Sequence, residues 1–391
     1  AVTPLFLLDP PDARAAWSPF SGVRPIAELR AGVPRLRERW EAALALTTTA
    51  ILSDACAGFV EIDAPPVVAM REIDGPAVIA AAWFAIAGPF TPAAATRRLT
   101  SSGETVAWIV PAGERWQGPA DTGAAEEVPG LALRGTSDLL TALDTMLTSD
   151  CLRLASTAGA PLPDGTIVFG ERKMVAAWGA EIEPGVVFDA RKGAVVLESG
   201  VEIRHGTRIE GPCYVGAGSR VLGGFIRGSV FGPRCVVHGE IAASSFLGYV
   251  NKSHDGFVGN SVLGHWVNLG AGTTTSNLKN TYGLVRLDVG GQVIETGRLN
   301  VGCLIGDHAK TAIGSMLNTG TVVGAGASVF GSAGIPKYVP PFAWGTATAE
   351  RMTEAGFLRI AERVMPRRDV ELSAERRQSL GATYRRMTGS Q

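Results

Sequence analysis

The chain has 391 residues, which is too many for one compact hydrophobic core and enough for two domains. Its 36 lysines and arginines nearly balance 37 aspartates and glutamates, so the overall charge indicates neither nucleic acid nor an anionic membrane as a partner. The five cysteines are scattered and form no CxxC pair, which argues against a zinc knuckle or a disulfide framework and indicates buried thiols in a reducing compartment.

Three regions differ in composition, and we predict a domain boundary between each pair. Residues 1–165 are rich in Ala, Leu and Arg, residues 166–340 in Gly, Val and Ile, and residues 341–391 in charged side chains. No stretch has the pattern of a signal peptide, and no uncharged apolar run reaches the length needed to span a membrane. We therefore expect a cytoplasmic protein.

The first region alternates strand and helix patterns. Apolar runs at 4–9 and 47–52 predict buried strands, and residues 25–46 between them carry apolar side chains at helical spacing. A further strand is expected at 104–111 and a helix at 137–146. This alternation favours an α/β domain.

The second region repeats every six residues. Aliphatic residues stand at this interval with small or polar residues between them, and the same phase returns twice later in the region, at Ile203, Ile209, Val215 and Val221, then Leu263 and Leu269, then Ile305, Thr311, Leu317, Val323 and Val329. Such a period is the spacing of hexapeptide β-helices, in which one aliphatic side chain per hexad points inward and the coils stack into a continuous core. A Gly-rich β-sandwich is the alternative, but its strands would recur every 8 to 12 residues without a fixed phase.

Two segments depart from the repeat. Residues 276–300 break the period, and we interpret them as a loop inserted between coils. Residues 348–387 have helical spacing interrupted at Pro366, with many arginines, and we expect helices that cap the open end of the solenoid or pack on a neighbouring subunit. A solvated charged face is the alternative explanation for the arginines.

His254 is the candidate catalytic residue. It lies in a polar break, residues 251–256, directly before the repeat resumes. Acyl transfer from a thioester to an amine needs a base that accepts the amine proton near neutral pH, which a neutral imidazole can do. Asp255 or a backbone carbonyl could orient the ring.

Three segments resemble the bifunctional enzymes that make UDP-N-acetylglucosamine by acetylating glucosamine 1-phosphate and transferring a uridylyl group. They are residues 249–256 (YVNKSHDG), 263–277 (LGHWVNLGAGTTTSN) and 305–311 (IGDHAKT). The whole chain is more closely similar to a divergent bacterial branch of sugar nucleotidyltransferases with a hexapeptide β-helix, whose N-terminal signature resembles residues 24–32 (RPIAELRAG). The resemblance implies an α/β nucleotidyltransferase-like domain, a left-handed parallel β-helix with a C-terminal helical tail, and a homotrimer with active sites between adjacent β-helices.

The same resemblance implies roles for individual residues. The catalytic base falls on His254, and residues fourteen positions before and after it, Glu240 and Asn268, fall on substrate-binding positions. Asn277 also falls on a substrate-binding position. Ala271 and Thr273 fall where the family lines its acetyl-CoA channel with small residues and backbone amides. Those amides could also face the developing oxyanion.

Two positions depart from the family pattern. A tyrosine of the family is Phe257 here, and its sugar-phosphate lysine is Ala242. The acceptor phosphate then needs other cations, and the candidates are Arg227, Arg234 and Lys252. His308 and Lys310 interrupt a hexad that should be regular, so they are candidates for the CoA phosphates or for a subunit contact; a satisfied structural pair is the alternative.

The first region lacks the Gly-rich loop with which sugar nucleotidyltransferases usually bind nucleotide phosphates. Arg14, Arg24 and Arg30 follow the first strand and could bind a triphosphate and a sugar phosphate. Transfer would need a carboxylate for Mg²⁺, and the candidates for that metal are Asp9, Asp54 and Asp138. The alternative is a shortened, degenerate domain that binds a ligand or supports the trimer.

The sequence therefore predicts an enzyme of nucleotide-sugar synthesis. It would use acetyl-CoA to N-acetylate an amino-sugar 1-phosphate and would join the product to a nucleotide. Two alternatives stay open: a nucleotidyltransferase whose β-helix serves only for trimerisation, and a non-catalytic regulatory or binding relative.

Overall fold

The N-terminal domain is built on a seven-stranded sheet. A computed structural model describes residues 3–11, 15–157, 159–331, 334–346 and 350–390. Four neighbouring pairs of strands, β5-β1, β1-β2, β2-β3 and β10-β7, run parallel, and β8 lies antiparallel to β5 and β7. The sheet order is β10 (Ala125–Glu127), β7 (Arg98–Ser101), β8 (Glu104–Val110), β5 (Ala77–Ala81), β1 (Leu5–Leu8), β2 (Thr48–Leu52) and β3 (Val67–Val68).

Helices and two small strand pairs complete this domain. The helix predicted over 25–46 is shorter than expected, because only η1 (Ile26–Glu28) and α1 (Leu36–Leu44) are helical. Between them Gly32 adopts a φ of +68°, and a Cβ there would collide with the side chains of Asp150 and Arg39. The helix predicted at 137–146, in contrast, is longer than expected and ends at Ala155. The remaining elements are α2 (Asp138–Ala155), the pair β6 (Phe84–Ile86) and β11 (Gly130–Ala132), and the pair β4 (Ile73–Asp74) and β9 (Arg115–Trp116).

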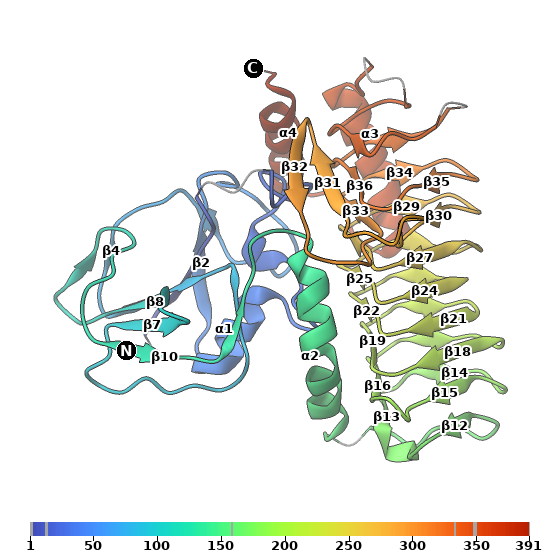
Figure 1. Ribbon diagram of the computed structural model, residues 1–391, viewed down its shortest axis with the longest axis horizontal. Helices are drawn as coiled ribbons and strands as arrows, with labels where there is room; N and C mark the ends of the chain where they lie inside the picture. Colours follow the sequence, from blue (N-terminus) through green and yellow to red (C-terminus); the bar gives the residue numbers. More distant parts are fainter. Residues whose placement is uncertain (1–2, 12–14, 158, 332–333, 347–349, 391) are drawn as a thin grey trace.

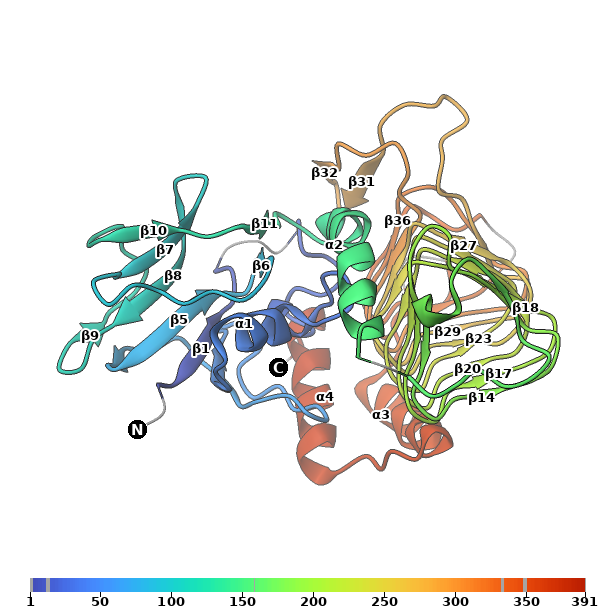
Figure 2. The same ribbon diagram turned by 90° about the horizontal axis from the view of Figure 1, so that it is seen from below.

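Residues from β12 onward form the expected parallel β-helix, whose stacked coils have three faces (Figures 1 and 2). The first face contains β12 (Ile167–Phe169), β15 (Val187–Asp189), β18 (Thr207–Glu210), β21 (Gly224–Arg227), β24 (Glu240–Ala242) and β27 (Phe257–Gly259), beside which lie β30 (Thr274–Thr275) and β35 (Met316–Leu317). The second contains β13 (Val175–Ala177), β16 (Val195–Leu197), β19 (Cys213–Val215), β22 (Val230–Phe231), β25 (Ser245–Phe246), β28 (Val262–Leu263), β33 (Cys303–Ile305), β36 (Thr321–Val323) and β38 (Tyr338–Val339). The third contains β14 (Glu181–Ile182), β17 (Glu202–Ile203), β20 (Arg220–Val221), β23 (Val236–Val237), β26 (Asn251–Lys252), β29 (Asn268–Leu269), β34 (Lys310–Thr311) and β37 (Ser328–Val329).

The six-residue phase is confirmed by burial. Every repeat position named from the sequence is buried in the interior of the coils. The glycines that follow these positions are required by the stacking, because a Cβ on Gly216 would lie 2.7 Å from the backbone carbon of Gly232 in the next coil. All five cysteines are also buried and free, as predicted.

The second face of the β-helix is covered by the N-terminal domain. Helix α2 lies along this face, and Leu143 and Leu147 pack there with Ala194 and Val196. The insertion forms a hairpin of β31 (Arg286–Val289) and β32 (Gln292–Glu295), and Leu287 of this hairpin joins the hydrophobic core that the N-terminal domain shares with Val262 and Leu304 of the second face. The inserted segment therefore belongs to the interdomain contact.

The C-terminal helices pack along the corner between the second and third faces, beside the last coils. Helix α3 (Glu354–Val364) ends before Pro366, as predicted, and is followed by η3 (Met365–Arg368) and α4 (Ala374–Thr388). Their apolar side chains cover Tyr249 and Trp266. Helix α4 also reaches the N-terminal domain, where Arg386 donates to the carbonyl of Gly22 at 2.8 Å. None of the helices among the described residues is long and apolar enough to cross a membrane.

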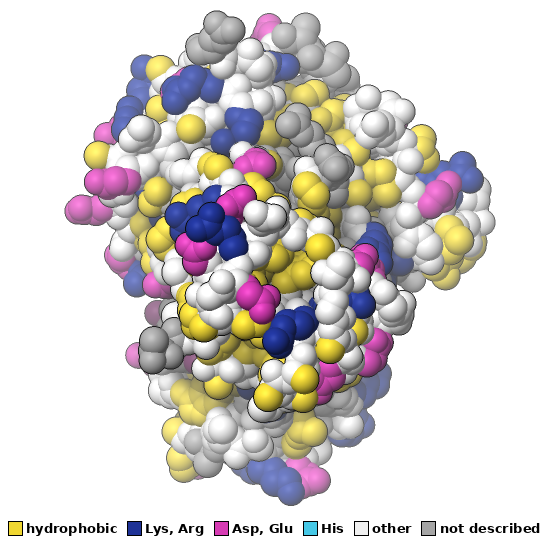
Figure 3. Space-filling model, turned by 90° about the vertical axis from the view of Figure 1, so that its left-hand side faces the viewer, with side chains coloured by type: hydrophobic (Ala, Val, Ile, Leu, Met, Phe, Trp, Pro, Cys, Tyr) yellow, Lys and Arg dark blue, Asp and Glu magenta, His cyan; other side chains and the backbone are white. Residues whose placement is uncertain are grey.

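The face of the N-terminal domain seen in Figure 3 carries small groups of positively and negatively charged side chains, which lie between hydrophobic and uncharged areas. This agrees with the near-zero net charge of the chain.

Replacing one inward aliphatic residue tests the stacked core. Leu263 is fully buried, so Leu263→Ala should lower the free energy of unfolding by about 2–5 kcal/mol, through lost burial and the cavity that remains. Val293 is 63% exposed on β32 of the inserted hairpin, and Val293→Ala should change this free energy little. Denaturant unfolding of both variants measures the difference; equal effects would contradict an inward-facing hexad.

Candidate active sites

His254 lies at the corner where the third face of the β-helix turns into the first. Strand β26 ends at Lys252 and β27 begins at Phe257, and the residues between them are bent around the corner. The imidazole is exposed beside an open groove. The side chains and backbone that line this groove come from four successive corners: His238, then Ser253, His254 and Asp255, then Ala271 and Gly272, then Ile313 and Gly314.

Backbone hydrogen bonds hold these corners together. The amide of Gly272 donates to the carbonyl of Asp255 at 3.0 Å, and the amide of Gly314 donates to that of Ala271 at 2.7 Å. The carboxylate of Asp255 lies 3.3 Å from Nδ1 of His238, so it faces His238, and no bond between it and the His254 ring is formed. The groove thus presents a solvent-accessible imidazole beside small residues.

Lys252 stabilises the corner from the interior of the β-helix. Its position is the inward one of its hexad, paired in register with Val237, and its side chain is only 2% exposed. The ammonium donates a hydrogen bond to the backbone carbonyl of His254. Burial lowers the pKa of Lys252 to about 8, while Asp255 opposes this shift. Lys252 therefore faces the core, away from the surface on which a phosphate was expected.

Glu240 and Arg227 form an ion pair on the first face, beside the corner. Their Oε1 and Nη2 atoms are 3.0 Å apart, and the guanidinium of Arg227 lies over the ring of Phe225 at 4.7 Å. Glu240 is adjacent in register to Phe257. The ring of Phe257 covers Gly259, where a Cβ would collide with it.

Asn277 lies on the same side as this ion pair. Its amide donates to Oδ1 of Asn260 at 2.7 Å, and its Nδ2 is 2.9 Å from where a Cβ on Gly259 would stand. The structure thus brings Arg227, Glu240 and Asn277 to one side of the His254 corner.

Asn268 lies on the other side of the corner, in the third face. It is paired in register with Asn251 and with Lys310. Its Oδ1 accepts a hydrogen bond from Nδ2 of Asn251 at 2.9 Å, and Oδ1 of Asn251 accepts one from Nη2 of Arg368 at 3.0 Å. The expected substrate residues are therefore divided between two faces that meet at His254.

Three further residues of the β-helix, which the sequence predicted to bind ligands, mainly contact other residues of the protein. Thr273 is buried and shares a hydrogen bond with Thr311, at 2.7 Å between the hydroxyl oxygens. Arg234 holds the tail, since Nη1 donates to Oδ2 of Asp369 at 2.7 Å. His308 is buried between Trp266 and Phe357, which fits the structural alternative for this residue.

The N-terminal domain has a small pocket at the carboxyl ends of β1 and β2. Its volume is about 60 Å³, and Asp9, Arg24 and Asp54 are among the residues that line it. The Asp9 carboxylate accepts hydrogen bonds from the amides of Ile26 and Ala27 at 3.2 and 3.3 Å. Burial raises its pKa to about 6, against the opposite effect of these hydrogen bonds.

Two of the three candidate Mg²⁺ carboxylates meet in this pocket. Asp54 accepts from the amide of Met70 at 2.7 Å, whereas Asp138 is in the first turn of α2 and accepts from the amide of Arg134 at 2.6 Å, away from the pocket lining. Within the described part of the chain, no three His, Cys, Asp or Glu side chains form a metal-binding group. A pair of carboxylates still suits Mg²⁺, which commonly takes one or two from the protein and the rest from substrate phosphates and water.

A buried ion cluster, which sequence reasoning missed, joins all three regions of the chain. Arg24 donates from Nη1 and Nη2 to Glu61 at 2.7 and 2.9 Å and from Nε to Asp307 at 3.0 Å. Glu61 is also 2.8 Å from Nδ1 of His265 and accepts from Arg376 of α4 at 3.3 Å. All five side chains are largely buried.

Two of the arginines predicted to bind phosphate, Arg24 and Arg30, already have hydrogen-bond partners within the protein. Arg24 lines the Asp9 pocket, but its guanidinium is already bound by two carboxylates. Arg30 donates to the carbonyls of Val33 and Leu247. Arg14 lies outside the described residues. The one signal in the sequence was Asp307, a charged residue inside a regular hexad, but its partners are far away in the chain and could not be inferred from spacing.

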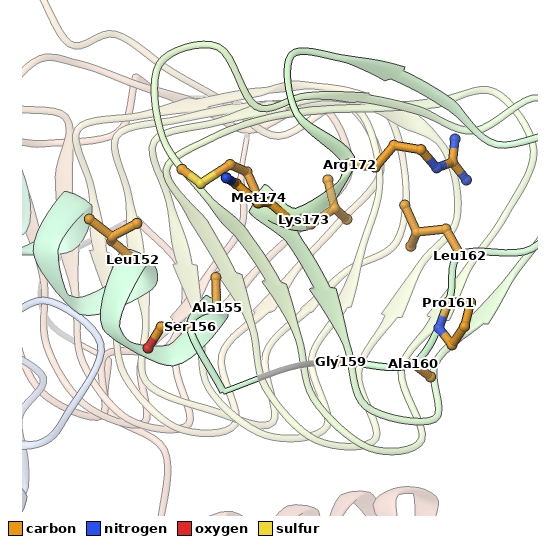
Figure 4. A pocket seen from close by; sticks show the side chains of 11 residues that line it. Leu152, Ala155, Ser156, Gly159, Ala160, Pro161, Leu162, Arg172, Lys173 and Met174 are labelled. Carbon is orange, nitrogen blue, oxygen red and sulfur yellow. The ribbon is translucent and has the colours of Figure 1, made fainter.

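A third pocket, of about 620 Å³, lies between the end of α2, residues 159–162 and η2 (Arg172–Met174) (Figure 4). Its lining is mainly apolar, with Leu152, Leu162 and Met174 among the larger side chains. Among the described residues that line it there is no histidine, cysteine or carboxylate, and Arg172 and Lys173 are its ionisable side chains.

Parts of the chain are similar to known transferases. Residues 5–158 match the model of a family described as sugar nucleotidyl transferase. The chain is 34% identical over 100 residues to a bifunctional sugar-1-phosphate nucleotidylyltransferase/acetyltransferase of Sulfurisphaera tokodaii, covering 26% of this chain and 25% of that protein. It is 30% identical over 184 residues to the bifunctional protein GlmU of Jannaschia sp., covering 45% of this chain and 35% of that protein. The matched parts span about a quarter to a third of these relatives.

Removing one carboxylate tests the ion cluster. Glu61→Gln should destabilise the protein by about 3–5 kcal/mol, because buried arginines lose part of their compensation. Glu104→Gln breaks the exposed pair with Arg134 and should cost at most about 1 kcal/mol. Thermal or denaturant unfolding compares the two variants; a Glu61→Gln protein as stable as Glu104→Gln would show that the cluster contributes little.

The buried histidine predicts a pH dependence of stability. Burial, with Lys310 and Arg376 nearby, holds the pKa of His308 well below its usual value of about 6.5. The unfolded chain then binds a proton that the folded chain does not, so stability should fall as the pH drops below about 6.5. In His308→Phe the decrease in unfolding free energy between about pH 7 and pH 5 should be smaller. An unchanged pH profile, matching that of His205→Phe at an exposed site, would exclude this contribution.

These comparisons confirm the resemblance found in the sequence: the chain combines a domain that matches the sugar nucleotidyl transferase family with a parallel β-helix and resembles bifunctional nucleotidylyltransferase/acetyltransferases.

Proposed function

We propose that the chain is a bifunctional transferase of nucleotide-sugar synthesis. At the His254 corner it N-acetylates an amino-sugar 1-phosphate, by the resemblance glucosamine 1-phosphate, with acetyl-CoA as the acetyl donor. In the pocket at Asp9 it joins the product to a nucleotide to give a UDP-N-acetyl sugar. The observation that carries the first half is the exposed imidazole of His254 beside a groove built from the small residues of successive corners.

In the acetyl transfer, His254 accepts a proton from the amine as the amine nitrogen attacks the thioester carbonyl. A C–N bond forms, the C–S bond breaks, and the proton passes from the imidazolium to the sulfur of CoA. The amides of Gly272 and Thr273 donate to backbone carbonyls. Ala271, whose amide has no acceptor within the described chain, is the donor that we assign to the developing oxyanion.

The arrangement of strands supports the nucleotidyl half. Strands β1 and β2 are parallel, and ligands of such sheets bind outside the carboxyl ends of the strands, where Asp9 and Asp54 lie. Mg²⁺ held by these carboxylates would neutralise charge on the transferred phosphates. Asp9 and Asp54 would orient the nucleotide through it.

Two observations favour a second candidate, an acetyltransferase whose N-terminal domain is not catalytic. The Asp9 pocket measures about 60 Å³, whereas ligand pockets commonly reach several hundred, so a nucleotide requires it to open. Arg24 is also committed to Glu61 and Asp307. In this case the domain would support the β-helix through α2 and the ion cluster.

The homotrimer expected from the resemblance is also part of our proposal. Ile313 and Met316 support it, because these apolar side chains are 80% and 70% exposed close to the groove. A neighbouring subunit that covered them would also enclose the His254 corner.

Two variants separate the two reactions. His254→Gln should slow acetyl transfer at least about a hundredfold and leave pyrophosphate release from UTP and the sugar phosphate unchanged. Asp9→Asn should have the opposite pattern, and His205→Gln, at an exposed corner, should affect neither. Acetyl-CoA consumption and pyrophosphate release are the measurements.

Full acetyl transfer by His254→Gln would overturn the first half of the proposal. Acetyl transfer without pyrophosphate release in the unmodified protein would leave the second candidate.

A further inference from the structure

The third face of the β-helix carries a row of polar side chains between the His254 corner and the C-terminal helices. Asn251, Asn268, Lys310 and Ser328 occupy one outward register position on four successive strands. Neighbouring strands are about 4.8 Å apart, so the side chains of successive rungs are within reach of a common ligand. The row ends at Arg368 of η3, which bonds to Asn251.

The hydrogen bonds in this row have a defined direction. A guanidinium can only donate, so Asn251 must present its oxygen to Arg368, and its NH2 group then faces Asn268. Asn268 must in turn present its oxygen to Asn251. The NH2 group of Asn268 is therefore left over, and no acceptor for it exists among the described residues.

Lys310, the next rung, adds a second unsatisfied donor. Its ammonium has one acceptor in the described chain, the carbonyl of His308 at 3.4 Å, and no carboxylate within ion-pair distance. Burial lowers its pKa to about 8. An ammonium placed in this way is stabilised by an anion that neutralises it and accepts its hydrogen bonds.

We propose that Lys310 and Asn268 form a binding site for a phosphoryl group of a substrate. The site offers only hydrogen-bond donors, the ammonium of Lys310 and the NH2 group of Asn268. A tetrahedral phosphoryl group can accept hydrogen bonds from both, because they stand on strands about 4.8 Å apart. Arg368 is a positioning residue, which acts through Asn251 to aim the NH2 group of Asn268. If the phosphoryl group is the 1-phosphate of the acceptor sugar, the site takes the place of the lysine that the family has at the position of Ala242.

The distance from the row to the proposed base fits this assignment. Asn251 precedes His254 by three residues, a span of at most about 10 Å. A phosphoryl group on this row would thus place the rest of its molecule at the corner. Two sources share this chemistry, the 1-phosphate of the acceptor sugar and the phosphates of CoA, and the inference rests on the proposed acetyltransferase function in naming them.

Calorimetric titration of the full chain tests the site without turnover. The ligands are glucosamine 1-phosphate, glucosamine and CoA, and the variants are Lys310→Met and Asn268→Asp. Asn268→Asp retains the acceptor for Asn251 but replaces the spare donor with a negatively charged oxygen. Each variant should weaken binding of one phosphorylated ligand at least about tenfold, while the exposed Lys337→Met should not.

The ligand that is affected identifies the source of the phosphoryl group. Weaker binding of glucosamine 1-phosphate, with glucosamine unchanged, assigns the site to the acceptor, whereas weaker binding of CoA assigns it to the donor. Unchanged binding of both phosphorylated ligands by both variants overturns the proposal. If phosphate-dependent binding is lost in the variants but the unmodified protein acetylates no amino sugar, the site stands and the proposed function fails.

Discussion

The stacking register of the β-helix is the constraint on which its candidate site depends. Each coil must place an aliphatic side chain above the one below it, and parallel strands about 4.8 Å apart then bring together residues that are 15 to 42 positions apart in the chain. Asn251, Asn268 and Lys310 are neighbours for this reason. The same register sets the four corners that form the groove at His254. A shift of one residue would turn these side chains into the core.

Lys252 shows how one departure from the repeat shapes the site. A buried ammonium is costly in a core of aliphatic residues, and here it is compensated by a hydrogen bond to the carbonyl of His254. This bond ties the exposed corner to the rigid interior. The catalytic base that we propose thus stands on a bend whose backbone is held from within, as preorganised catalysis requires.

The buried ion cluster has a comparable role between domains. Arg24 and Glu61 from the N-terminal domain, His265 and Asp307 from the β-helix and Arg376 from the tail neutralise one another out of water. Such groups are costly to separate, so the cluster favours a single arrangement of the three regions. It also places Arg24 between the Asp9 pocket, which it lines, and Asp307 of the β-helix.

The sequence by itself determined the β-helix and the first strands of the N-terminal domain. A six-residue period predicts which side chains are buried, because the coil repeats locally, and His254 stood out as a polar break in that period. The strands at 5–8 and 48–52 followed equally from local pattern. Only the tertiary structure decided that Lys252 points inward, that Arg24 is bound by Glu61 and Asp307, and that Arg368 orients Asn251. These contacts join residues up to 283 positions apart, and their free energy depends on burial and on partners that no local spacing specifies.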